Sequence, residues 1–152
     1  MKSILARILT VIFFTLSIIH FYWALGGQWG FESALPSNEQ GIKILQPSTV
    51  DCIAIGSLLL LFGFLYYFSK TSLKNKLLDS TRKLLLWIIP IIFLIRSIGD
   101  FRFFGFFKQV KGTEFANLDS VFYSPLCLII AVIGISYLVI KTTKKNNSGF
   151  DH

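Results

Sequence analysis

Three ionisable residues, His20, Arg96 and Asp100, stand inside or beside strongly apolar segments of this sequence. An ionisable side chain in the hydrocarbon of a membrane is costly, so it is a functional-site hypothesis by default. In a site, Arg96 would bind an anion or a lipid head group, and His20 or Asp100 would transfer a proton. Arg96 and Asp100 are four residues apart and share a helix face if the helix continues through Gly99. The structural alternative is therefore an ion pair between them that only holds helices together.

Three further residues, Asp51, Tyr123 and Ser124, complete the candidate ligand-binding set. A rise of about 1.5 Å per helical residue places His20 and Arg96 in the outer half of a membrane core roughly 30 Å thick. We expect all six residues to line one outward-facing polar pocket. Asp51 has a competing role, because it stands three residues after Ser48, as in the capping box of a helix start.

Other chemistries find less support. His20 is the only histidine outside the C-terminal tail, and no second ligand stands at a metal-site spacing from it. Ser124 lacks the glycine-flanked signature of a nucleophilic serine. Cys52 and Cys127 form no C-x-x-C pair, which argues against quinone-linked redox chemistry; we expect two separate buried thiols, with a structural disulfide as the alternative. We expect no metal and no cofactor, and the sequence leaves open whether the protein is an enzyme.

Membrane-spanning helices would position these residues. The chain has 152 residues, of which 53% are hydrophobic, and its mean hydropathy is +0.64. A spanning helix needs roughly 20 mostly apolar residues. Four runs fit this requirement: residues 4–26, 50–68, 84–98 and 121–140. They leave no room for a soluble catalytic domain, so the predicted fold class is all-α, a polytopic membrane protein with four transmembrane helices in one domain.

Small and polar residues recur on one face of several predicted helices, and small residues allow helix backbones to approach closely in lipid. These stripes predict that the four helices form a compact bundle. Pro90 should kink the third helix. The stripes are Thr10, Ser17, His20, Ala24 and Gly27 in the first helix, Gly56 and Gly63 in the second, and Cys127, Ala131 and Gly134 in the fourth.

The charges predict the orientation in the membrane. A net charge of +7 would suggest nucleic acid as the partner of a soluble protein. Here, however, most basic residues lie near the N-terminus, in the loop 69–83 and in the tail 141–152. Most acidic residues lie in the loops 27–49 and 99–120. Basic segments stay in the cytoplasm. We therefore expect the lipid bilayer and no nucleic acid as the partner, both termini in the cytoplasm, and the loops 27–49 and 99–120 outside. Cleavage of residues 4–26 as a signal peptide is disfavoured by the length of the run.

Residues 101–107 hold many phenylalanines and read as an interfacial stretch on the outer leaflet, from which Arg102 and Lys108 extend to the head groups. Polar residues before the helices predict their N-caps. The predicted caps are Ser48 for the second helix, Asp79 or Ser80 for the third, and Asp119 or Ser120 for the fourth.

Three blocks of the sequence carry a resemblance to a known family. They are HFYWALGGQWG at 20–30, RSIGDFRFFGFFK at 96–108, and Asp119 with YSPLC at 123–127. Together they resemble a bacterial family of small four-helix membrane proteins, domain-of-unknown-function family 3995. The resemblance covers nearly the whole chain. It implies four spans in the bacterial plasma membrane and carries over no activity and no ligand residue.

The leading hypothesis for function is a binding protein that holds a small molecule or a lipid head group in the outward-facing pocket. One alternative is a membrane-embedded enzyme acting on a lipid-soluble substrate, with His20 or Asp100 as acid or base and Arg96 as anion clamp. A small oligomeric transporter is disfavoured because the inner halves of the helices carry few polar residues. The last alternative is a structural or partner protein without a ligand. The sequence does not set the oligomeric state.

Overall fold

The structure, a computed structural model, describes residues 2–69, 71 and 75–147, with side chains described for residues 3–69, 71 and 75–141. Within these residues the chain is all-α, and no β-strand forms. The four long helices are α1 (Lys2–Ala24), α2 (Thr49–Tyr67), α3 (Lys76–Ile98) and α5 (Ser124–Asn147). Three short elements accompany them: the 3-10 helix η1 (Glu32–Ala34), α4 (Glu114–Leu118) and the π-helix η2 (Asp119–Tyr123).

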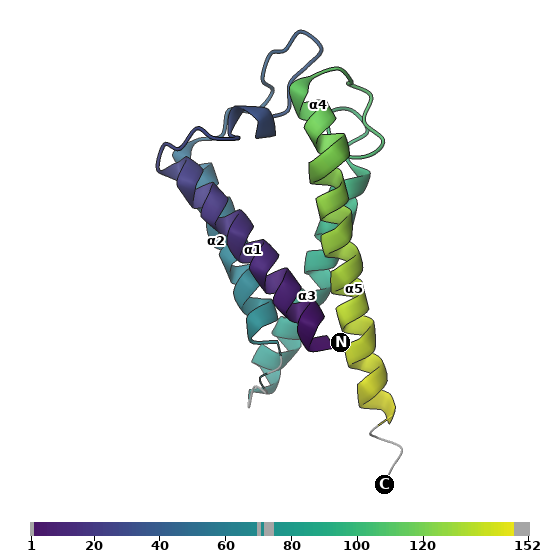
Figure 1. The fold of residues 1–152 in the computed structure, drawn as a ribbon. Coiled ribbons are helices and arrows are strands. Elements are labelled where there is room, and N and C mark those ends of the chain that lie inside the picture. The colour runs from purple at the N-terminus through teal and green to yellow at the C-terminus, as the bar shows by residue number, and fades with distance from the viewer. Residues whose placement is uncertain (1, 70, 72–74, 148–152) are drawn as a thin grey trace.

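The long helices form two antiparallel hairpins, α1 with α2 and α3 with α5 (Figure 1). Glycines create the close approach inside each hairpin. A Cβ on Gly63 of α2 would lie 2.3 Å from the ring of Phe14 on α1, and a Cβ on Gly134 of α5 would lie 2.8 Å from Pro90 on α3. The small-residue positions of α2 and α5 therefore pack helices within hairpins.

The hairpins share one hydrophobic core at the end of the molecule where the N-terminus lies, which we call the core end. Its centre takes one aromatic ring from each long helix. Phe13 stacks on Tyr66 with ring centroids 5.8 Å apart and packs against Phe93 at 5.4 Å, and Tyr66 meets Tyr137 edge-on at 5.8 Å. Because aromatic pairs gain energy beyond their buried area, this cluster joins the two hairpins.

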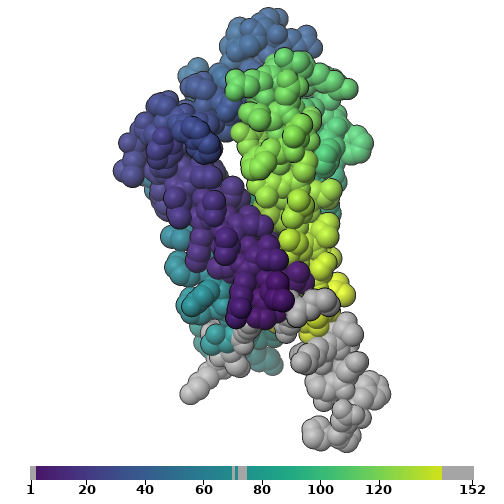
Figure 2. Space-filling view, in the orientation of Figure 1, coloured from purple at the N-terminus to yellow at the C-terminus, as the bar shows by residue number. Residues whose placement is uncertain are grey.

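At the opposite end, which we call the loop end, the hairpins diverge. Figure 2 shows an opening that passes through the molecule between them, which we call the window. Loop one (residues 25–48) crosses from the α1–α2 hairpin toward the top of α4 and forms its roof (Figure 1). There Ser33 shares a hydrogen bond with Tyr123. The predicted compact bundle is therefore present only at the core end, where Gly134 of α5 also lies against Tyr66 of α2.

Helix ends test the predicted caps. The capping box of α2 is confirmed: the Ser48 N–H donates to the Asp51 carboxylate at 2.8 Å, and the Asp51 N–H donates to the Ser48 hydroxyl at 3.3 Å. The prediction for α3 is wrong, since the Asn75 side chain accepts from the first backbone N–H groups and the helix begins earlier than expected. Asp79 instead pairs with Arg82 at 2.5 Å and with Lys83.

The last helical segment also begins earlier than predicted. Thr113 is its N-cap, accepting from the Ala116 N–H at 3.1 Å. The chain then stays helical through α4, η2 and α5, and the π-helix inserts one wide turn at Asp119–Tyr123. Asp119 and Ser120 therefore lie inside a helix and do not cap it. Such π turns often mark functional positions.

Three described helical segments have the length and apolar composition of membrane spans: Ser3–Ala24, Thr49–Tyr67 and Glu114–Lys141. The protein is therefore a helical membrane protein. The remaining long helix, α3, carries Arg82 and Lys83 near one end and Arg96 near the other, which sets it apart in composition.

Candidate functional site

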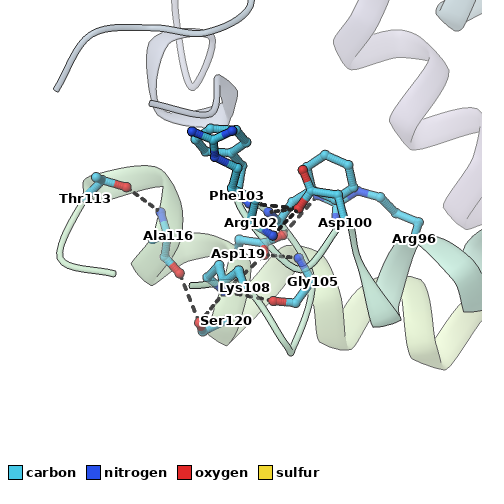
Figure 3. A network of polar contacts seen from close by, with 11 residues as sticks. Arg96, Asp100, Arg102, Phe103, Gly105, Lys108, Thr113, Ala116, Asp119 and Ser120 are labelled. Carbon is cyan, nitrogen blue, oxygen red and sulfur yellow. Dashed lines mark hydrogen bonds and ion pairs between the residues drawn. The ribbon is translucent and has the colours of Figure 1, made fainter. Parts of the chain in front are cut away.

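The most buried ionisable group of the loop end is Asp119, whose side chain has no exposed surface. Its Oδ1 accepts a hydrogen bond from the Arg96 guanidinium at 2.9 Å, and its Oδ2 accepts from the Lys108 ammonium at 3.1 Å and from the Gly105 N–H at 2.8 Å (Figure 3). We call Arg96, Lys108 and Asp119 the charge cluster. It ties the end of α3, the loop after α3 and the π turn to one another.

A tight loop brings these side chains together. Gly99 ends α3 with φ +95°, and Gly105 has φ +90°, conformations that favour glycine. The two glycines touch, since a Cβ on Gly105 would lie 2.3 Å from the Gly99 Cα. This contact closes loop three (residues 99–113) on itself and points the Gly105 N–H at Asp119.

Asp100 organises the same loop from its exposed side. Its Oδ1 accepts from the backbone N–H groups of Arg102, Phe103 and Phe104 at 2.9, 2.7 and 3.1 Å (Figure 3). Burial alone would raise the pKa of Asp100, but the three backbone donors outweigh it and hold this pKa below its ordinary value of 3.8. Asp100 therefore acts as a loop cap.

Within the charge cluster, the two cations are used differently. The Lys108 side chain is 4% exposed, and its ammonium donates to the Gly105 carbonyl, Asp119 and the Ser120 hydroxyl at 3.1, 3.1 and 2.7 Å. All three of its protons therefore have acceptors. The Arg96 guanidinium lies over the Phe104 ring at 4.7 Å, and its buried Nη1 has no hydrogen-bond partner among the described residues. Two cations share one carboxylate, so the cluster carries a net positive charge.

The predicted ion pair between Arg96 and Asp100 is wrong. Gly99 ends the helix before Asp100, and Arg96 pairs with Asp119 instead. The prediction that Lys108 extends to the head groups is also wrong, since its side chain is buried. Arg102 does stay exposed, over the ring of Phe103 at 4.9 Å.

A cavity of about 160 Å³ lies between α1, α2 and loop one, and we call it the roof pocket. It contains two of the sequence candidates, His20 and Asp51. The His20 Nδ1 lies 2.8 Å from the Leu16 carbonyl. Because a carbonyl can only accept, Nδ1 is the donor in this contact. The roof pocket is lined by His20, Trp23, Phe31, Ala34, Leu35, Pro47, Asp51, Cys52 and Ile55.

The last two sequence candidates, Tyr123 and Ser124, lie where η2 meets α5. Tyr123 stacks on Phe115 with centroids 6.0 Å apart and takes part in the roof contact with Ser33. Ser124 is fully buried, and its hydroxyl has no partner among the described residues. The structure thus distributes the six candidates over the roof pocket, the charge cluster, loop three and the start of α5. It does not gather them in one pocket.

Sequence reasoning missed Asp119 as the partner of Arg96. The signal available was its position just before an apolar run, which equally fits an N-cap, so spacing alone favoured Asp100. Among the described residues, no three His, Cys, Asp or Glu side chains lie together in a way that could hold a metal ion. Cys52 and Cys127 are separate free thiols.

Two hairpins of long apolar helices define a small helical membrane protein. The chain belongs to the family described as Protein of unknown function (DUF3995), which matches residues 13–134. That range contains the roof pocket and the charge cluster. Neither the curated proteins nor the solved structures contain a match to the chain.

Proposed function

We propose that this protein is a four-span protein of a bacterial plasma membrane that binds a lipid-soluble small molecule in the roof pocket. The molecule would have an apolar body and an O–H or N–H group at one end. The observation that carries the proposal is the lining of the roof pocket, because it combines hydrogen-bond acceptors with apolar side chains.

Packing supports α3 as the fourth span. It lies along α5, a candidate span, and its Leu86 and Ile89 are buried in the shared core. A helix packed along most of a spanning helix crosses the same bilayer. Its charges are near its ends, where Arg82 donates to the Phe68 and Thr71 carbonyls at 3.1 and 2.7 Å beyond the end of α2.

Charge distribution supports the orientation. Lys2, Lys76 and Arg82 lie toward the core end, whereas Glu32, Asp100 and Glu114 lie toward the loop end. Since basic segments remain in the cytoplasm, the core end with both termini faces the cytoplasm. The roof pocket then faces outward.

The polarity of the roof pocket limits the ligand. The Asp51 Oδ1 accepts no hydrogen bond from the described residues, while Oδ2 accepts from Ser48. With Nδ1 bonded to the Leu16 carbonyl, the His20 ring in its neutral form would present Nε2 as a second acceptor. Acceptors bind donors, so the polar end of the ligand should be a hydroxyl or an amine. The rest of the lining includes Trp23, Phe31 and Ile55, which fit an apolar body.

Native mass spectrometry tests this proposal. The protein would be extracted with its surrounding lipid in polymer-bounded discs and compared with Ile55→Trp, which fills the pocket. Ile53→Trp is the matched control, since Ile53 and Ile55 are similarly exposed, at 46% and 45%, but only Ile55 lines the pocket.

We expect a discrete bound mass in the wild type and in Ile53→Trp that is lost in Ile55→Trp. Extraction with lipid avoids stripping a loosely held molecule. The same adduct pattern in all three proteins, or no adduct in the wild type, would rule out the roof pocket as the binding site.

A further inference from the structure

A different cavity, of about 150 Å³, lies between loop three and α4, and we call it the loop-three pocket. We infer that it binds the phosphate group of an anionic phospholipid. It is lined by Phe106, Lys108, Lys111, Ala116, Asn117 and Ser120, none of which belongs to the roof pocket. The inference does not depend on a ligand in the roof pocket.

The charge of the loop-three pocket favours an anion. Two lysines line the loop-three pocket and no carboxylate does. The carboxylate that contacts Lys108 is Asp119, and the two cations Arg96 and Lys108 together exceed its single negative charge. In the low dielectric around a side chain that is 4% exposed, this excess positive charge is weakly screened. The pocket therefore attracts an anion.

The loop-three pocket also has free hydrogen-bond donors. Lys108 has used its three protons, so it provides charge and no direct contact. Lys111 and Asn117 are exposed, and neither the Lys111 ammonium nor the Asn117 side-chain amide has a partner among the described residues. An ammonium and an amide at the rim of a positive pocket match the several acceptor oxygens of a phosphate.

Exposed phenylalanines beside the loop-three pocket indicate that the phosphate belongs to a lipid. Phe106 lines the pocket and is 47% exposed, and its neighbour Phe107 is 64% exposed. Large exposed apolar side chains beside a polar pocket are expected where a surface meets the boundary between head groups and acyl chains. A phospholipid fits both parts at once, since its phosphate enters the pocket and its chains lie along the phenylalanines. A free phosphate ion uses only the pocket.

The test is a titration of the full-length protein in mild detergent with phosphatidylglycerol, followed by native mass spectrometry. Lys111→Gln removes the free cation of the pocket. Arg102→Gln is the matched control, because it removes an exposed cation from the same loop, and the Arg102 side chain lies over Phe103 and does not line the pocket. Both variants change the net charge equally.

We expect Lys111→Gln to weaken binding of the first phosphatidylglycerol about tenfold, as for the loss of one charged hydrogen bond, while Arg102→Gln binds as the wild type does. Inorganic phosphate in excess should leave the bound lipid in place. Equal weakening by both variants would reduce the effect to general surface charge and overturn the site. Displacement by inorganic phosphate would overturn its assignment to a lipid.

Discussion

Removing the charge of Asp119 should be among the most damaging conservative substitutions in this protein. Asp119→Asn keeps the size of the side chain, so it opens no cavity. It leaves Lys108, whose side chain is 4% exposed, and Arg96, which is 30% exposed, without a counter-charge. One amide oxygen also cannot serve the Arg96 guanidinium on one side and both the Gly105 N–H and the Lys108 ammonium on the other.

Breaking a buried pair by removing one partner costs about 3–5 kcal/mol, which is a large part of a total stability of roughly 5–15 kcal/mol. We expect a loss of this size for Asp119→Asn. Glu114→Gln is the control, because Glu114 is exposed at the start of α4 and contributes at most about 1 kcal/mol there.

The assay is equilibrium unfolding of the purified protein by SDS in mixed micelles, followed by tryptophan fluorescence. A third variant separates charge from packing. The combination Arg96→Met, Lys108→Met and Asp119→Leu removes the whole charge cluster, and apolar replacement of a buried ionic group is often neutral or stabilising by about 1–4 kcal/mol. If Asp119→Asn stays within about 1 kcal/mol of the wild type, or the triple variant is less stable than Asp119→Asn, the electrostatic reasoning fails.

Three smaller predictions concern the loops and caps. Gly105→Ala should prevent loop three from closing, because the new Cβ would lie 2.3 Å from the Gly99 Cα, whereas Gly112→Ala, also at positive φ but with open space, should cost only about 1–2 kcal/mol of unfolding free energy in the same assay. Similar losses for the two would contradict the close contact. Ser48→Ala should cost about 1 kcal/mol through loss of the capping box, and Ser57→Ala, in the interior of the same helix, should cost less; equal melting temperatures for Ser48→Ala and wild type would argue against the cap. The lowered pKa of Asp100 means that its stabilisation is complete above the ordinary value of 3.8 and is lost as the pH falls through the lower folded value. Asp100→Asn keeps an acceptor and does not titrate, so the wild type should lose melting temperature relative to it between about pH 7 and about pH 3, and a constant difference would refute the role of the carboxylate.

Apolar length predicted most of the fold. The first two helices, expected at 4–26 and 50–68, are found at Lys2–Ala24 and Thr49–Tyr67. The capping box of Ser48 and Asp51 was readable because it depends only on local spacing. Helix starts were harder to predict where several residues could cap the helix. Asn75 caps α3 in place of Asp79, because Asp79 instead pairs with Arg82.

The charge cluster and the window could not be read from the sequence. An ion pair of Arg96 with Asp100 can be predicted from sequence spacing alone. The pair of Arg96 with Asp119 forms only because the fold brings together two residues that are 23 positions apart in the sequence. Gly99 was visible as a possible break in the helix, yet its contact with Gly105 is tertiary. Gly56 and Gly63 face α1, whereas Gly134 faces both Pro90 of α3 and Tyr66 of α2. A small-residue stripe alone does not say which neighbour it faces, so the divergence of the hairpins could not be predicted from it.

The one-sided position of the aromatic core has a mechanical consequence. Phe13, Tyr66 and Tyr137 lie at a pivot point between the hairpins. Among the described residues, the contacts that join the hairpins at the loop end are those of loop one with the α4 region, including Ser33 to Tyr123. Trp23 lies ten residues along α1 from Phe13, which is roughly 15 Å, so a rotation of about 5° at the pivot moves the loop end of α1 by about 1 Å. A small change in the packing of Phe13 would therefore change the width of the window, at a distance from the substituted side chain.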